Sequence, residues 1–176
     1  RTQTLDTIAQ NTGKEKAIEK NFPGVKILST KRTVGKKAID PVFDSLQFTY
    51  ELQHSDQFYF IQPKFLSVLS KNPFTKNERI TDIDFGCNQL VGSTIRIQID
   101  SSFEVEHLPK SITVTAPDSA FYYSRTYSFE SSLLEMNEVF EIRKPEFEKE
   151  AYRGIKEFFD KAFMLMKEEI ILKKKK

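Results

Sequence analysis

The spacing of apolar side chains changes at about Pro145, and this change constrains the fold more than any other feature. Before it, short runs alternate apolar with polar residues, most clearly at 45–52 and 133–142. This period of two is typical of strands with one buried and one wet face. From about Glu148, apolar residues recur at the spacing of a helix. The sequence therefore predicts a β-rich chain that ends in a helix at 148–171.

Strand patterns bounded by turn signals recur along the chain and predict about eight strands. They are expected at 25–34, 45–52, 58–61, 94–99, 103–107, 111–116, 121–129 and 133–142. A short helix is predicted from Lys14 to Phe22, ended by Pro23-Gly24. The predicted fold class is mainly β, an antiparallel β-sandwich with this short N-terminal helix and the long C-terminal helix packed on the sheet.

Three details of the pattern make specific predictions. The stretch from Asn72 to Gly86 is neither a helix nor a clean strand, and its apolar side chains are expected to point inward: Phe74, Ile80, Ile83 and Phe85. On the strand at 133–142, Glu138 is the exception on an otherwise apolar face. The lysines at 173–176 are expected to complement the negative end of the helix dipole.

Composition limits the domain count and the classes of partner. We expect residues 1–12 to be frayed and residues 13–176 to form a single domain, because 176 residues suffice for one core. Lys and Arg number 27 against 25 Asp and Glu, which is too near neutral to predict a nucleic-acid partner. No run of about 18 apolar residues exists, so no membrane span is predicted. Because the chain begins at Arg1, we interpret it as a fragment or a processed product.

A cysteine hydrolase can be written from the residues present, but nothing local supports it. The set consists of Cys87, either His54 or His107, and either Asp82 or Asp84. Cys87 follows a strand-like piece and has no helix start to lower its pKa. The interpretation we prefer is a half-buried structural thiol and two structural or surface histidines. No ligand-type spacing or glycine-rich phosphate loop is present, so we predict no catalytic, metal-binding or cofactor-binding residue and no cofactor.

One aromatic cluster is a candidate binding surface. Tyr122, Tyr123 and Tyr127 lie near Arg125 and could stack on bases or sugars. Packing within the sheet explains them more simply. A peptide- or glycan-binding module using Tyr122, Tyr123 or a strand edge remains an alternative, and it requires an exposed aromatic patch.

Three segments carry a resemblance to a bacterial family. They are Asn72-Pro-Phe-Thr-Lys-Asn-Glu-Arg79 with Ile83-Asp-Phe-Gly86, His107-Leu-Pro-Lys-Ser-Ile-Thr-Val-Thr-Ala-Pro-Asp118, and the ending from Glu150 to Lys174; weaker similarity reaches back to residues 17–24. This part of the chain resembles the C-terminal domain of unknown function of secreted transglutaminase-like proteins, in which two such domains flank a papain-like core.

The resemblance implies a non-catalytic, β-rich accessory domain of a periplasmic or secreted protein. Its implied partner is the transglutaminase-like core upstream in the same protein, together with a protein or glycan ligand. The catalytic residues of the family would lie in that core, and no position of this sequence matches their motif. Cys87 stands where relatives tend to carry an aromatic residue.

Overall fold

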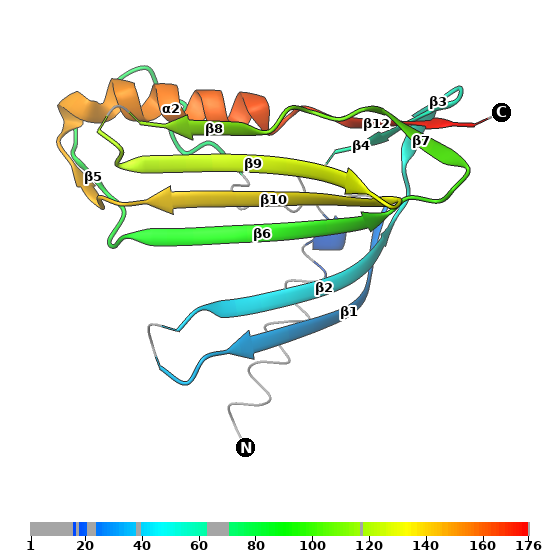
Figure 1. Ribbon diagram of the computed structural model, residues 1–176. Helices are drawn as coiled ribbons and strands as arrows, with labels where there is room; N and C mark the ends of the chain where they lie inside the picture. The colour runs from blue at the N-terminus through cyan, green and yellow to red at the C-terminus, as the bar shows by residue number, and fades with distance from the viewer. Residues whose placement is uncertain are drawn as a thin grey trace. The chain divides into compact units, whose positions relative to one another are not determined.

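A computed structural model describes residues 16, 18–20, 24–37, 40–62, 71–116 and 118–175 (Figure 1). The chain divides into two compact units, Arg1–Gln53 and His54–Lys176, and each is described by itself. The predicted frayed segment 1–12 lies outside the described residues, and the single domain 13–176 stays a prediction. Of the predicted helix at 14–22, residues 16 and 18–20 are described, and they are helical.

The first unit contains an antiparallel hairpin. Strand β1 (Val25–Val34) pairs with β2 (Val42–Tyr50), which begins earlier than the sequence predicted. Gly24 precedes β1 with φ +93°, which a glycine adopts readily because it has no Cβ. Its carbonyl accepts a hydrogen bond from Glu51 N at 2.9 Å. Across the pair, Arg32 Nε donates to Asp44 Oδ1 at 2.6 Å and Arg32 Nη2 to Oδ2 at 2.7 Å.

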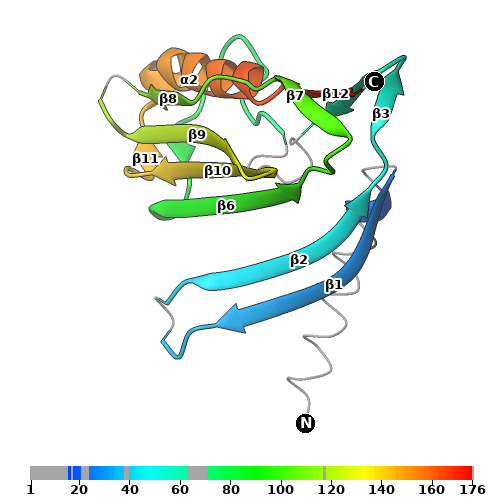
Figure 2. The same ribbon diagram turned by 45° about the vertical axis from the view of Figure 1, so that its right-hand side comes forward.

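The second unit is built around a four-stranded antiparallel sheet. Its strands are β6 (Gln89–Gln98), β8 (Ile112–Thr115), β9 (Phe121–Glu130) and β10 (Leu133–Ile142), in the order β6-β10-β9-β8. Side chains alternate across β10 as predicted, because every even-numbered residue from 134 to 142 is buried. Figures 1 and 2 show β9 and β10 as the long central strands of this sheet.

Two further sheets belong to the fold. Strands β3 (Gln53–Ser55), β4 (Phe58–Ile61), β12 (Ile170–Lys174) and β7 (Phe103–His107) are joined in the order β3-β4-β12-β7. The short strands β5 (Ile83–Asp84) and β11 (Glu146–Phe147) pair with each other near the end of β10 (Figure 2). All described pairings are antiparallel. The predicted mainly β, antiparallel fold is confirmed.

The C-terminal helix packs on the main sheet. A 3-10 turn, η2 (Lys149–Ala151), leads into α2 (Tyr152–Leu165), which lies along the sheet in Figure 1. The helix buries one apolar face: Tyr152, Ile155, Phe158, Phe159, Ala162 and Phe163. The Phe158 ring stacks on Phe121 of β9, with centroids 5.3 Å apart, and lies 6.4 Å from the ring of Phe140 on β10. The predicted docking is therefore confirmed.

The helix ends earlier than predicted, and the prediction of a helix to residue 171 is wrong. After Leu165 the chain turns and residues 170–174 form β12, which pairs with β4 on one side and β7 on the other. Ile170 and Leu172 are 1% and 2% exposed, so a short apolar run is buried as a strand. The lysines at 173 and 174 lie in this strand rather than at a helix end, and Lys173 Nζ lies 3.6 Å from Glu106 Oε2.

The stretch 72–86 also contains one incorrect prediction. Phe74 and Ile83 are buried and Phe85 is half-buried, as expected, but Ile80 is 90% exposed. The Arg79 guanidinium donates to the carbonyl of Thr81 at 3.0 Å and so closes a tight bend. Ile80 lies within this bend and points outward, because the backbone direction rather than hydrophobicity decides its orientation.

The β9–β10 hairpin turns through two serines with positive φ. Ser131 has φ +49° and Ser132 has φ +65°, the pattern of a type I′ turn, which favours Asn-Gly. An L residue in this region costs about 1–2 kcal/mol.

We expect Ser132→Gly to raise the free energy of unfolding by about 0.5–1 kcal/mol, measured by urea titration. Ser128→Gly, in extended and exposed β9 backbone, should lower it by a similar amount. A loss of stability in Ser132→Gly would show the turn model to be wrong.

Candidate functional site

A buried ion pair lies on the helix-facing side of the main sheet. Arg125 of β9 and Glu138 of β10 are directly opposite each other, and Arg125 Nη2 donates to Glu138 Oε1 at 2.9 Å. The two side chains are 1% and 0% exposed. The Tyr123 hydroxyl donates to the same Glu138 oxygen at 2.7 Å. The carboxylate therefore accepts hydrogen bonds from both Tyr123 and Arg125 within the sheet.

The same arginine reaches the end of the helix. Arg125 Nη1 donates to the carbonyl of Met166, the residue that follows α2, at 3.2 Å. The last carbonyls of a helix have no partner within it and carry the negative end of its dipole. Arg125 therefore links β10, β9 and the C-terminus of α2 through one guanidinium.

Burial and charge together set the protonation of this cluster. Burial, and then the Glu138 charge, raise the pKa of Tyr123 far above its ordinary value. Burial also raises the pKa of Tyr127, while the charge of Arg125 opposes this rise. Burial is the largest single influence on Arg125 and would lower its pKa, but the charge of Glu138, the two neighbouring tyrosines and the hydrogen bond to Glu138 together raise the pKa. The tyrosines stay neutral and the guanidinium stays charged. The cluster is therefore a structural ion pair surrounded by neutral polar side chains.

The stability of the protein at alkaline pH should depend on the buried tyrosines of this cluster. A folded-state pKa above the unfolded value of 10.0 means that the folded protein holds the proton more tightly. The associated stability is present below about pH 10 and is lost as pH rises further. In an ultraviolet titration, we expect Tyr123 and Tyr127 to ionise only as circular dichroism shows unfolding. Ionisation of all six tyrosines in a molecule that is still folded would contradict this.

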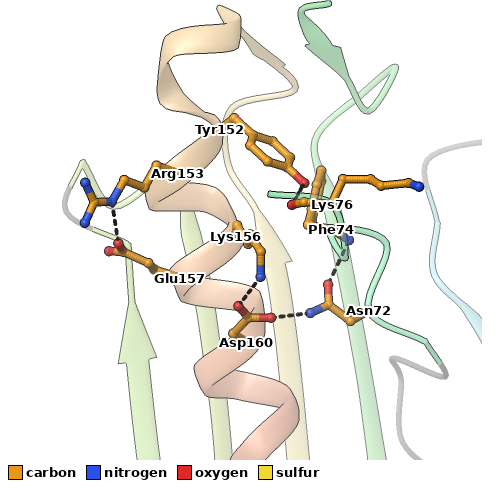
Figure 3. A network of polar contacts seen from close by, with 8 residues as sticks. All are labelled: Asn72, Phe74, Lys76, Tyr152, Arg153, Lys156, Glu157 and Asp160. Atoms are coloured by element: carbon orange, nitrogen blue, oxygen red, sulfur yellow. Dashed lines mark hydrogen bonds and ion pairs between the residues drawn. The ribbon is translucent and has the colours of Figure 1, made fainter. Parts of the chain in front are cut away.

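The stretch 72–86 is fastened to α2 by a second polar network (Figure 3). Asn72 Nδ2 donates to Asp160 Oδ1 at 2.8 Å, and Lys156 Nζ donates to the other oxygen of Asp160 at 2.5 Å. The Tyr152 hydroxyl donates to the carbonyl of Lys76 at 2.6 Å. Beneath these bonds, the Phe74 ring lies 4.8 Å from that of Phe159. The stretch 72–86 therefore holds α2 in place.

Asp82 caps the start of the helical segment from outside it. Its Oδ1 accepts a hydrogen bond from Lys149 N at 3.0 Å, and neither η2 nor α2 has a cap from its own flanking side chain. We expect Asp82→Ala to lower the free energy of unfolding by about 1 kcal/mol in urea titrations. Glu78→Ala, at an exposed position in the same stretch, should change it by less than about 0.5 kcal/mol. Equal effects from both substitutions would exclude a cap.

The residues of the candidate cysteine hydrolase are not brought together. Cys87 is exposed and lies just before β6, near β5, while His54 and His107 lie in β3 and β7. Figure 1 shows β5 and β7 at opposite ends of the main sheet, which β6 spans with ten residues, about 30 Å. His54 instead stacks on Tyr59, with ring centroids 5.2 Å apart. His107 ends its strand and is exposed.

The two aspartates considered with Cys87 serve local structure. Asp84 Oδ1 accepts a hydrogen bond from Gly86 N at 2.6 Å, and Asp82 is the cap described above. In the part of the chain that the structure describes, no group of three or more His, Cys, Asp or Glu residues could hold a metal ion. Within the same residues, no helix is long and apolar enough to cross a membrane.

The tyrosine surface considered from the sequence is divided between two faces of the sheet. Tyr123 is 0% exposed in the core, and the Tyr127 hydroxyl is buried. Tyr122 is half-buried on the other face, where Arg143 Cζ lies 5.2 Å from its ring centroid. Of the three side chains, Tyr122 alone lies on the face away from α2, so they do not form one aromatic patch.

Sequence reasoning missed the Arg125–Glu138 pair, although the signal for it was present. Glu138 was recognised as a charge on an apolar face, and Arg125 has the same parity as Phe121 and Tyr123. Folding the two strands about Ser131-Ser132 places position 125 opposite position 138, as observed. The register of the hairpin, rather than either strand alone, identifies the pair.

The fold defines an antiparallel β module closed by one helix, with a buried ion pair and no assembled reactive site among the described residues. The chain belongs to the family described as "Domain of Unknown Function with solved-structure structure (DUF3858)", whose model matches residues 56–172. Among curated proteins, none is similar to it in sequence.

A solved structure shares the fold. It is the crystal structure of a putative protease from Parabacteroides distasonis ATCC 8503, with a TM-score of 0.55 and 12% sequence identity. The similarity covers 69% of this chain and 24% of the Parabacteroides protein. At this identity the match shows a common fold, and the chain spans about a quarter of that protein's length.

Proposed function

We propose that this chain is the C-terminal accessory domain of a longer transglutaminase-like protein, with a structural or partner-binding role and no chemistry of its own. One observation carries the proposal. The segments with the family pattern are also the segments that build the core of the second unit. They supply Phe74 and Ile83, then Val114 and Ala116, and finally the buried face of α2. The residues that carry the family resemblance are therefore accounted for by packing of the core.

The similarity to part of a longer protein supports the same proposal. The match leaves about three quarters of the Parabacteroides protein outside the shared fold. A module of this kind would support or position a neighbouring domain through an inter-domain surface of about 600–1,500 Å². The proposal includes a periplasmic or secreted parent protein, which the resemblance of the sequence to secreted proteins supports.

The reading frame upstream of Arg1 provides the first test. We expect it to encode a papain-like core with a cysteine, a histidine and an aspartate that can act together. A reading frame without such a core would contradict the accessory role and favour a free-standing peptide- or glycan-binding module.

An activity assay of the parent protein provides the second test. Replacing the core cysteine with serine should abolish peptide hydrolysis and amine transfer, whereas Cys87→Ser should leave both rates unchanged. Cys87 alone should react with iodoacetamide at the rate of an ordinary exposed thiol, because it is exposed and distant from both histidines. Loss of activity in Cys87→Ser would overturn the non-catalytic role.

A further inference from the structure

The turn end of the β1–β2 hairpin exposes apolar side chains on both of its faces. Val34 and Val42 are opposite each other in the last pair of the two strands and are 62% and 54% exposed. Phe43, the next residue on β2, projects from the other face and is 61% exposed. Exposed apolar side chains that lie together and are rimmed by charge are typical of an interaction site. Residues 31–37 and 40–44 are called the hairpin tip below.

The charge around these apolar side chains is positive. Residues 31–44 contain four cations and two carboxylates, so the net charge is +2. Arg32 and Asp44 form an ion pair at 2.6 Å, and their charges offset each other. The other three cations are Lys31, Lys36 and Lys37, and all three are exposed. The tip therefore combines apolar side chains with a surplus of exposed ammonium groups.

The remaining carboxylate, that of Asp40, serves the turn itself. Asp40 Oδ2 accepts a hydrogen bond from Lys37 N at 2.9 Å, and Asp40 N donates to the carbonyl of Lys37 at 3.0 Å. Asp40 also packs against Gly35, where an added Cβ would lie 2.0 Å from the Asp40 Cβ. The turn is thus closed by its own contacts, and the apolar and cationic side chains are presented without a partner having to order them.

We propose that the hairpin tip binds the anionic surface of a phospholipid bilayer. Val34, Val42 and Phe43 enter the headgroup region, and the exposed lysines lie among the lipid phosphates. Such a surface presents negative charge directly above apolar chains, which matches the combination at the tip. An acidic protein surface would pair with the lysines but would cover only one face of the hairpin, whereas lipids surround an inserted tip on both faces. This inference goes beyond the accessory role proposed above and does not depend on it.

A single tryptophan can report on insertion, because the chain contains none. In Phe43→Trp, we expect the emission to shift to shorter wavelength on addition of vesicles that contain phosphatidylcholine and phosphatidylglycerol in equal amounts. Vesicles of phosphatidylcholine alone should cause no shift. Leu28→Trp is the matched control, since Leu28 is 53% exposed on β1 but lies about 20 Å along the strand from Val34. No shift in Phe43→Trp, an equal shift with both kinds of vesicle, or an equal shift in both variants would overturn the proposal.

Lysine variants in the Phe43→Trp background test the electrostatic part. Replacing Lys36 and Lys37 together with Gln should weaken binding to the mixed vesicles about 25-fold, since each lysine near an anionic surface contributes about a factor of five. Lys26→Gln, at the other end of β1, should leave the affinity unchanged. Equal effects of the double variant and Lys26→Gln would contradict binding through the tip.

Co-sedimentation of the unmodified chain provides a measurement that needs no substitution. The chain should sediment with the mixed vesicles at low ionic strength and be released at high ionic strength, because salt screens the lysine charges. It should remain in the supernatant with phosphatidylcholine alone. Binding to a soluble polyanion such as heparin, without sedimentation on the mixed vesicles, would assign the tip to an acidic macromolecule and refute the lipid proposal.

Discussion

Glu138→Ala is expected to lower the free energy of unfolding by about 3–5 kcal/mol, because it leaves the Arg125 charge buried without a partner. Arg125 is fully buried, so its charge remains in the core after the carboxylate is removed. The Tyr123 hydroxyl also loses its acceptor. Urea unfolding followed by circular dichroism gives the measurement.

The matched control replaces the whole cluster with apolar groups of similar shape. In the triple variant Tyr123→Phe, Arg125→Met and Glu138→Leu, no buried polar side chain of the pair remains. Replacing a complete buried ion pair in this way is often neutral. We therefore expect the triple variant to recover most of the stability that Glu138→Ala loses. If the triple variant is as unstable as Glu138→Ala, the intact ion pair itself contributes to the free energy of unfolding, and the loss in Glu138→Ala does not come from the unpaired Arg125 charge.

Phe159→Ala is expected to lower the free energy of unfolding by about 3–5 kcal/mol, because it opens a cavity where α2 meets the sheet. Phe159 is 2% exposed, and its ring centroid lies 4.8 Å from that of Phe74 and 5.7 Å from that of Phe140. It therefore joins the helix to both the stretch 72–86 and β10. Urea titration of the variant and of the unmodified chain gives the difference.

Met164→Ala on the same helix is the control for this prediction. Met164 is 62% exposed, so its truncation should change the free energy of unfolding by less than about 0.5 kcal/mol. Similar losses at the two positions would mean that helix propensity, rather than docking on the sheet, determines the effect. A loss below about 1 kcal/mol at Phe159 would show that the helix does not pack as described.

Local patterns predicted those elements whose burial follows a simple period. The strand at 133–142 has the predicted bounds, and the apolar stripe of the helix is the face that packs on the sheet. In both cases the buried side chains recur at the period of the element, which is two residues in the strand and 3.6 residues in the helix. Frequent turn signals also sufficed to predict antiparallel pairing, since short connections cannot join parallel strands.

Predictions failed where a partner distant in sequence decides the conformation. Residues 170–174 continue an apolar pattern that suits a helix, but β4 and β7 offer free strand edges on both sides. Ile80 has the hydrophobicity of a core residue, yet the bend closed by Arg79 turns it outward. Neither partner can be recognised within a local window of sequence.

The candidate site shows the same division. The sequence identified Glu138 as an exception on an apolar face and named Arg125, but only the register of the β9–β10 hairpin places them opposite each other. The sequence alone also supplied a cysteine, two histidines and two aspartates that the structure keeps apart or uses elsewhere.

By itself, the sequence determined the class of fold, most strand positions and the buried face of the helix, because these depend on periods within one element. The tertiary structure alone decided where the helix stops, which charges meet in the core and how Asp82 of the stretch 72–86 caps η2, which leads into α2. These outcomes depend on contacts between residues distant in the chain, whose energies appear only when the elements are packed.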